Sequence, residues 1–170
     1  MLDEIIVVEI PPLYSCYSRI GEQKCVPIFG GHSRRVVHGA LNIQSGDLAL
    51  LITEEWNQWT HQDFLSMVRA HWRGWHIVLF EDRGSPHTAT ASQAYAAQAN
   101  LQIRWLPRAT PELNTMDQLW RRATSRVLAN CPPLPIDAKA MKLCQHLIDL
   151  KPQERLRQAG VFAPDFWLAP

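Results

Sequence analysis

The order of the predicted strands and helices constrains the fold of this chain more than any other feature of its sequence. Three stretches rich in β-branched and apolar residues come first, and helical periodicity then alternates with short apolar runs. The predicted strands cover 4–10, 34–43, 47–53, 76–80 and 101–106, and the predicted helices cover 60–72, 88–99 and 115–129. Hairpin-linked strands followed by strand–helix units give a mixed sheet with helices on its faces.

This order, β-β-β-α-β-α-β-α, is that of an α/β, RNase H-like fold with three antiparallel N-terminal strands. Local signals refine the element boundaries. Thr60 and Asp63 are spaced as a capping box for the first long helix. Asp137 is placed to cap a further helix that ends at Leu150, and a short strand is predicted at Cys25–Ile28.

The chain of 170 residues suits one main domain. A proline cluster at 131–135 marks a boundary, so we expect a core over residues 1–130 and a helical C-terminal appendage over 131–170. The four cysteines form no CxxC pair, which favours reduced thiols in the cytoplasm. The apolar run near the N-terminus is too short for a membrane span, and acids stand where a signal peptide has lysines.

The formal net charge of +1 conceals an uneven distribution of charge. Residues 1–82 carry six basic and ten acidic side chains, whereas residues 83–170 carry eleven basic and six acidic ones. An acidic half and a basic half can place carboxylates beside a surface that binds a polyanion. Ordinary solvated charge explains the same distribution, so charge alone does not decide between the two interpretations.

Three carboxylates fall where predicted strands end or helices begin. Asp3 lies in the opening strand, and Asp82 follows the apolar run 76–80 at the carboxyl end of a central strand. Asp117 lies in the first turn of its helix if Asn114 is the N-cap. Neighbouring strands lie about 4.8 Å apart, so Asp3 and Asp82 can share an ion if their strands pair. Each acid alone also fits an ordinary strand-end or capping role.

Three converging carboxylates without histidine or cysteine partners favour Mg²⁺ or Mn²⁺ over zinc, because hard cations prefer oxygen ligands. Two such ions about 3.5–4 Å apart would activate a water or a 3′-hydroxyl and stabilise the leaving oxygen of a phosphodiester. The residue types therefore predict phosphodiester chemistry, but their spacing leaves the purely structural interpretation open.

Four segments carry motifs whose order and spacing are specific. They are LDE at 2–4, RRVVHGALNIQSGDL at 34–48, FEDRGSPHTA at 80–89 and LPRATPELNTMDQLWRR at 106–122. Together they resemble the catalytic domain of DDE transposases, in particular the bacterial insertion-sequence branch of the mariner superfamily. That family places its acids in an (F/L)DE opening, a D-(N/R)-x-x-x-H segment and a PELNxx(E/D)xxW segment, which correspond here to Asp3, Asp82 and Asp117. The 34 residues between the last two acids match the superfamily's usual interval.

The resemblance implies a transposase catalytic domain, which cuts DNA at the ends of a mobile element and transfers the cut strand into target DNA. The implied cofactor is a pair of Mg²⁺ ions, for which Mn²⁺ substitutes, bound by Asp3, Asp82 and Asp117. The implied partners are double-stranded DNA and either a second copy of the chain or a separate N-terminal DNA-binding polypeptide. The implied location is the bacterial cytoplasm, at the nucleoid when DNA is bound. The alternative is a truncated, non-catalytic remnant that binds only DNA or a transposase.

Further residues of these motifs have two interpretations each. Candidate DNA contacts are Arg83, His87, Arg108, Arg121 and Arg122. For the histidine, a structural role with satisfied ring nitrogens is an equal alternative. Glu112 is a rival for the third acid, but the resemblance and the position of the helix cap favour Asp117.

The chain departs from the family at its N-terminus. Only two residues precede Asp3, so the first strand is expected to be truncated, and no helix-turn-helix region precedes it. The third acid is Asp instead of the commoner Glu, and Arg83 replaces the frequent Asn. These departures indicate a catalytic-domain fragment, derived either from a split transposase gene or from a decayed copy.

Overall fold

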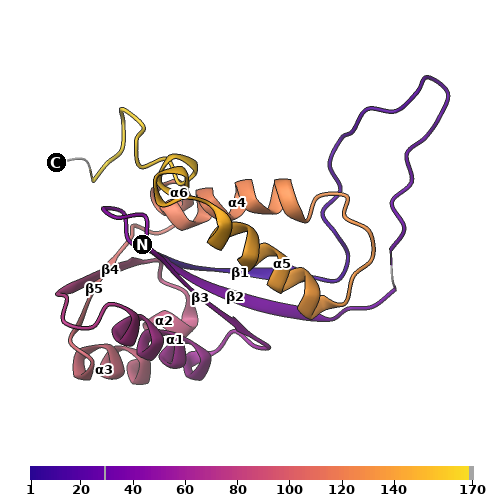
Figure 1. The fold of residues 1–170 in the computed structure, drawn as a ribbon. Coiled ribbons are helices and arrows are strands. Elements are labelled where there is room, and N and C mark those ends of the chain that lie inside the picture. Colours follow the sequence, from indigo (N-terminus) through magenta and orange to yellow (C-terminus); the bar gives the residue numbers. More distant parts are fainter. Residues whose placement is uncertain (29, 169–170) are drawn as a thin grey trace.

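The strands form one antiparallel sheet and one parallel pair. The structure is a computed structural model that describes residues 1–28 and 30–168. The antiparallel sheet has the order β1-β2-β3, and β4 pairs in parallel with β5 (Figure 1). The strands are β1 (Leu2–Val8), β2 (Arg34–Leu41), β3 (Leu48–Thr53), β4 (Ile77–Glu81) and β5 (Leu101–Trp105). The three antiparallel N-terminal strands and the mixed α/β architecture were correctly predicted from the sequence.

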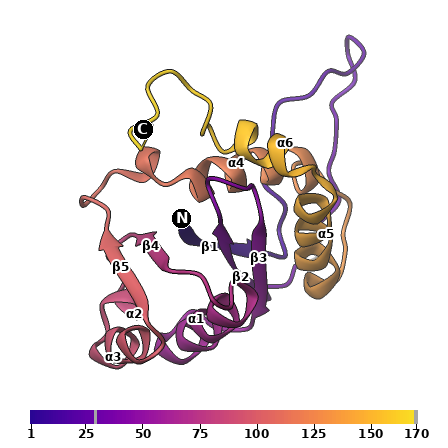
Figure 2. The ribbon, with the colours of Figure 1, turned by 60° about the vertical axis from the view of Figure 1, so that its left-hand side comes forward.

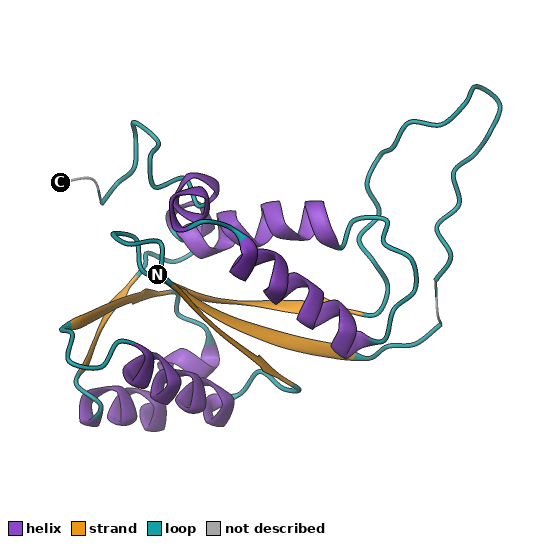
Figure 3. Cartoon of the chain, viewed as in Figure 1, coloured by secondary structure: helices purple, strands orange, loops and turns teal. Residues whose placement is uncertain are grey.

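The helices lie on both sides of these strands. Figure 3 shows α1, α2 and α3 together on one side, and α4, α5 and α6 on the other. The helices are α1 (Gln58–His71), α2 (Ser85–Thr88), α3 (Thr90–Gln98), α4 (Thr115–Val127), α5 (Ile136–Asp149) and α6 (Pro152–Gln158), with a 3₁₀ turn η1 (Pro111–Leu113) before α4. Among the described residues, no helix is both long and apolar enough to cross a membrane.

Each side of the antiparallel sheet has its own hydrophobic core, because side chains alternate between the two faces of a strand. One core lies under α1 and α3 and includes Leu2, Phe64 and Val68. The other lies under α4 and α5 and includes Leu119 and Leu143. The residues after 131 therefore pack in the same core as α4, and the domain boundary at residue 130 stays a prediction.

The position of β4 relative to β1 is the feature that matters most for function. Figures 1 and 2 show β4 beside the N-terminal end of β1. Among the described residues the two strands share no ladder of main-chain hydrogen bonds, because β1 pairs with β2 and β4 pairs with β5. Other contacts must therefore fix the distance between the two strands.

The predicted cap of the first helix is wrong by three residues. Asn57, not Thr60, is the N-cap of α1, and its side chain accepts hydrogen bonds from the amides of Trp59 and Thr60. The Thr60 hydroxyl accepts a hydrogen bond from the Asn57 amide and completes the capping box. Asparagine is the earlier strong acceptor, so the helix begins half a turn sooner than predicted.

Two other local predictions are also wrong. Helix α5 begins at Ile136 with Pro135 as its cap, so Asp137 lies in the first turn instead, where it pairs with Arg35 at 2.6 Å. No strand forms at Cys25–Ile28, because this segment belongs to the long loop between β1 and β2, which projects away from the sheet in Figure 1. Among the described residues, no strand lies beside this part of the loop to pair with it.

Candidate active site

Four acids line one cleft, and three of them are those that the sequence singles out. The cleft has a volume of about 680 Å³, and Asp3, Asp82 and Asp117 all lie on its wall. They come from β1, from the residue that follows β4 and from the first turn of α4. The structure thus brings together the three acids that the sequence singles out. Glu112, the rival third acid, lies in η1 and does not line this cleft.

Strand β1 directs its two neighbouring acids to opposite faces, as the alternation of a strand requires. Leu2 and Glu4 face the side of α1, so Asp3 between them faces the side of α4. Glu4 nevertheless also lines the cleft. Asp3 lies inside the ladder, directly opposite Gly39 of β2. The main-chain pairing of Leu2 with Ala40 continues the ladder before it, so Asp3 is held on both sides.

Gly39 lets α4 lie close to the sheet at this point. A Cβ atom at residue 39 would lie 2.5 Å from Met116 Cε and 2.5 Å from Trp120 Cζ2, which is closer than van der Waals contact allows. Both of these side chains belong to α4 and are buried. The missing side chain of Gly39 therefore brings α4, and with it Asp117, toward Asp3.

Asn114 fixes where α4 begins. Its Oδ1 atom accepts a hydrogen bond from the Met116 amide at 3.1 Å, which confirms the predicted N-cap. Its Nδ2 atom donates to the main-chain oxygen of Leu2 at 3.0 Å. The residue that starts the helix of Asp117 is therefore bonded to the strand of Asp3.

One oxygen of Asp82 is held by two donors. Oδ1 accepts from the Gly84 amide at 2.9 Å and lies 2.7 Å from His87 Nδ1. The structure shows no hydrogen bond to Asp82 Oδ2 among the described residues. The carboxylate is therefore oriented through one oxygen while the other is available to the cleft.

The electrostatics of the cleft favour a bound cation. Burial, reinforced by the charges of Glu4, Asp82 and Asp117, raises the pKa of Asp3 to about 8. Burial also raises the pKa of Asp117, although Arg121 opposes this effect. In contrast, the hydrogen bond from His87 lowers the pKa of Asp82. Mutually repelling carboxylates with no histidine or cysteine ligand on the cleft wall fit a hard divalent cation.

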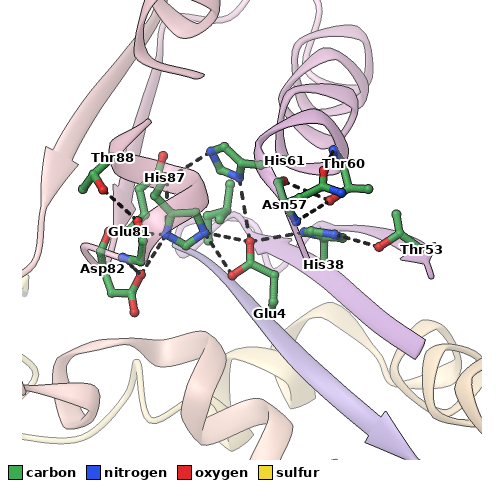
Figure 4. Close-up of polar contacts among 12 residues, drawn as sticks. Glu4, His38, Thr53, Asn57, Thr60, His61, Glu81, Asp82, His87 and Thr88 are labelled. Atoms are coloured by element: carbon green, nitrogen blue, oxygen red, sulfur yellow. Dashed lines mark hydrogen bonds and ion pairs between the residues drawn. The ribbon is translucent and has the colours of Figure 1, made fainter. Parts of the chain in front are cut away.

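A cluster of buried histidines surrounds Glu4 (Figure 4). Glu4 Oε1 lies 2.8 Å from His87 Nε2, 3.2 Å from His38 Nδ1 and 3.8 Å from His61 Nδ1. All three imidazoles are at most 1% exposed. Burial alone would raise the pKa of Glu4, but the hydrogen bonds to His38 and His87 hold it well below its usual range.

Glu81 extends this cluster into the interior at the end of β4. Its side chain is fully buried, and burial raises its pKa to about 8 despite the opposing charge of His87. Its nearest partner is His61, with 3.5 Å between Glu81 Oε2 and His61 Nε2. Glu4, His38, His61 and Glu81 come from four separate elements, and no single motif contains them all, so this cluster could not be predicted from the sequence.

The candidate DNA contacts do not form one surface. Arg83 and Arg108 line the acid cleft, whereas Arg121 and Arg122 line a separate hollow on the outer side of α4. His87 lies at neither place, because its side chain is 1% exposed and its ring nitrogens face carboxylates. The prediction of a direct DNA contact by His87 therefore does not fit the structure, and its structural alternative does.

Residues 1–134 match the model of the family described as DDE superfamily endonuclease. The chain belongs to this family. No curated protein is similar enough to the chain to be matched with it. The place of this DDE superfamily endonuclease in a bacterial branch stays a prediction.

Solved structures of the Mos1 mariner transposase have the same fold as this DDE endonuclease. The paired-end complex with Mn superposes with a TM-score of 0.71 at 15% identity, over 93% of this chain and 50% of that one. The complex with the left transposon end gives 0.70 at 14% identity, with the same coverage. The isolated Mos1 catalytic domain gives 0.60 at 14% identity, over 75% of this chain and 68% of that one. The RNase H-like prediction is thereby confirmed, and the chain spans about half the length of the Mos1 chains in the complexes.

Proposed function

We propose that the chain is a transposase catalytic domain that cuts DNA at transposon ends and transfers the cut strand into target DNA. The observation that carries this proposal is the convergence of Asp3, Asp82 and Asp117 on one cleft of a DDE superfamily endonuclease. The raised pKa of Asp3 supports it, because burial and the neighbouring carboxylates make the negative charge of Asp3 costly unless a cation compensates it. In this proposal the three acids are the catalytic residues.

The three acids would hold Mg²⁺, or Mn²⁺ in its place, as a pair of ions. When bound, such ions activate the attacking oxygen and stabilise the leaving oxygen of the phosphodiester. Asp82 Oδ2 is available for this role, since the bonds to Gly84 and His87 use Oδ1. The carboxylates of Asp3 and Asp117 would complete the ligand set from the other two sides of the cleft.

The basic residues would bind the phosphate backbone. Arg83 and Arg108 lie on the wall of the acid cleft, where they would position the strand to be cut. Arg121 and Arg122 line the outer hollow of α4 together with Arg126, and we assign them to a more distant stretch of the duplex. Such contacts position DNA without reading its sequence.

The structural relatives support DNA as the partner. Mos1 transposase was solved in paired-end complexes with transposon ends and in a strand transfer complex. Its catalytic domain was also solved with Mg and with Mn, each time together with raltegravir. A second copy of the chain or a separate DNA-binding polypeptide is also part of the proposal, as a partner beside the DNA. A bacterial cytoplasmic location, at the nucleoid when DNA is bound, stays a prediction.

A metal-dependent nicking assay on transposon-end DNA tests the proposal. The wild-type chain should cut with Mg²⁺ or Mn²⁺ and not with EDTA, and Asp82→Asn should abolish cutting. Asp63→Asn is the matched control, because Asp63 is exposed on α1. Calorimetry should show Mn²⁺ binding that is lost in Asp82→Asn. DNA binding without Mn²⁺ binding would overturn the proposal in favour of a non-catalytic remnant.

A further inference from the structure

Asp3 lies on β1 and Asp82 directly follows β4, and these two strands share no main-chain ladder among the described residues. Strand β1 takes its main-chain partners from β2, and β4 takes its partners from β5. Leu2 of β1 and Leu79 of β4 pack in one hydrophobic core. Because a metal site tolerates little misplacement of its ligands, side-chain hydrogen bonds at the acids themselves also matter.

His87 connects the two strands through its side chain. Its Nε2 atom lies 2.8 Å from Glu4 Oε1 and 3.0 Å from Glu4 Oε2, and its Nδ1 atom lies 2.7 Å from Asp82 Oδ1. Figure 4 shows the imidazole between the two carboxylates, with Glu4 on β1 and Asp82 after β4. Because carboxylates only accept hydrogen bonds, both ring nitrogens donate.

The surroundings hold this imidazole in place. The ring of His61 packs against it with 4.5 Å between centroids, and Glu81 Oε2 lies 3.9 Å from Nδ1. The indole of Trp56 also meets it edge-on, with 6.2 Å between the ring centroids. Gly84 leaves room for this packing, since a Cβ there would lie 2.9 Å from Trp56 Cζ2 and 3.3 Å from His87 Nδ1. The ring therefore has little freedom to turn away from either carboxylate.

We propose that His87, together with Glu4, is a positioning residue that holds Asp3 and Asp82 at the separation required for metal binding. The inference rests on the proposed function, because it assumes that these two acids bind the ions. Glu4 directly follows Asp3 in β1, so a hydrogen bond that fixes the position of Glu4 also limits how far Asp3 can move along the wall of the cleft. At the other end, the same imidazole orients the carboxylate of Asp82 through Oδ1.

A transition-metal ion in the cluster is the main competing explanation. Ligand atoms of Glu4, His61 and His87 lie within 4.8 Å of one another. Both nitrogens of His61 lack a hydrogen-bond partner among the described residues. However, His87 Nε2 already lies at hydrogen-bond distance from both oxygens of Glu4. The proton of this hydrogen bond lies between the two ligand atoms, where a metal ion would otherwise have to bind. The geometry therefore favours the hydrogen-bonded bridge.

Calorimetry with Mn²⁺ tests the inference on the full chain. A glutamine at residue 87 has one nitrogen in place of the two ring nitrogens, so His87→Gln cannot donate to Glu4 and Asp82 at once. Glu4→Gln keeps the size of the side chain and removes its charge. We expect each variant to bind Mn²⁺ about 10–100-fold more weakly, the range found when the partner of a metal ligand is lost. His76→Gln is the control, because His76 is exposed at the start of β4. The double variant should lose less than the product of the two single losses.

A second readout separates positioning from general stabilisation. The Tm of each variant is measured in EDTA and in saturating Mn²⁺, and the rise in Tm caused by the metal should shrink in both variants. If a variant has a lower Tm than the wild type in EDTA but the folded variant binds Mn²⁺ with unchanged affinity, the bridge has only a structural role and the inference is overturned. If His87→Gln does not fold, Glu4→Gln alone decides the outcome by the same criterion.

The outcomes distinguish this inference from the proposed function. If the wild-type chain shows no Mn²⁺ binding that depends on Asp82, the proposed function fails. If the wild type binds Mn²⁺ and both variants bind it equally well, the inference fails and the proposed function stands. The inference would also be overturned if the wild-type chain purified with one zinc ion per chain and His61→Gln purified without it, because zinc would then be bound by Glu4, His61 and His87.

Discussion

Asn114 joins the start of helix α4 to strand β1 by a hydrogen bond from its Nδ2 atom to the main-chain oxygen of Leu2, at a distance of 3.0 Å. The same side chain caps α4 through its Oδ1 atom. One asparagine thus sets both the beginning of the helix that carries Asp117 and its attachment beside Asp3.

Asn114→Ala should lower the free energy of unfolding and weaken metal binding together. Loss of the cap alone costs about 0.5–2 kcal/mol, and the buried oxygen of Leu2 also loses its donor. Asn57→Ala is the matched control, because it removes the cap of α1 away from the cleft. Chemical denaturation should show both variants destabilised, and calorimetry should show weaker Mn²⁺ binding only for Asn114→Ala. Equal Mn²⁺ affinity in the two variants would contradict the role given to Asn114.

Gly39→Ala should destabilise the fold by about 1–3 kcal/mol, the usual range for overpacking a core. The added methyl group would overlap Met116 and Trp120 and push α4 away from the sheet. Urea denaturation measures the change, with Gly30→Ala as the control, since a Cβ at Gly30 meets no atom within 4 Å. A variant as stable as the wild type would show that α4 adjusts without cost.

The stability of the metal-free chain should depend on pH through Asp3. The pKa of this carboxyl is about 8 in the folded chain against an ordinary value of 3.8, so the folded state binds more protons between these values. Its contribution to stability is therefore complete below pH 3.8 and is lost as the pH rises to about 8. Asp3→Asn removes this dependence and should be more stable than the wild type at pH 8 in EDTA.

Unfolding in EDTA from pH 5 to pH 8.5 checks this prediction for both proteins. The other titrating groups cancel in the difference between the two curves, so the advantage of Asp3→Asn should increase with pH. If the two plots of unfolding free energy against pH are parallel, the pKa of Asp3 is not raised in the folded chain.

The four cysteines should react in two classes. Cys16 and Cys25 are exposed, whereas Cys131 and Cys144 are buried, and burial raises the pKa of the Cys144 thiol to about 11. A thiol reagent at pH 8 should therefore modify two thiols in the native chain and four after denaturation. In Cys16→Ser, only one thiol, that of Cys25, should react rapidly in the native chain. Rapid reaction of all four thiols in the native chain would contradict the packing of α5.

Local sequence signals predicted the elements well where they act within a few residues. The cap at Asn114 was found because asparagine directly precedes a periodic helix, and the pattern of the strands was found from their β-branched residues. The cap of α1 was misplaced because Thr60 is part of the capping box but not its first residue. Position in the chain cannot distinguish these two roles of a threonine.

The candidate site was predicted in part. The motifs placed Asp3, Asp82 and Asp117 together, and all three line the cleft. They did not predict the histidine cluster around Glu4, because His61 lies outside the motifs and no spacing rule connects His38 or His87 with that carboxylate. Only the packing of β2 and α1 against β1 brings those side chains to one carboxylate.

By itself, the sequence determined the order of strands and helices, the three acids and their family, because periodicity, capping and motif spacing are local properties of a chain. The tertiary structure alone decided that β1 and β4 lie side by side, with no shared ladder in the part of the chain that the structure describes, and that His87 bridges Glu4 and Asp82. It also decided between the two interpretations of His87, because the side chain is buried and cannot contact DNA directly. The physical reason is that burial and side-chain hydrogen bonds across 83 residues of sequence depend on how whole elements pack.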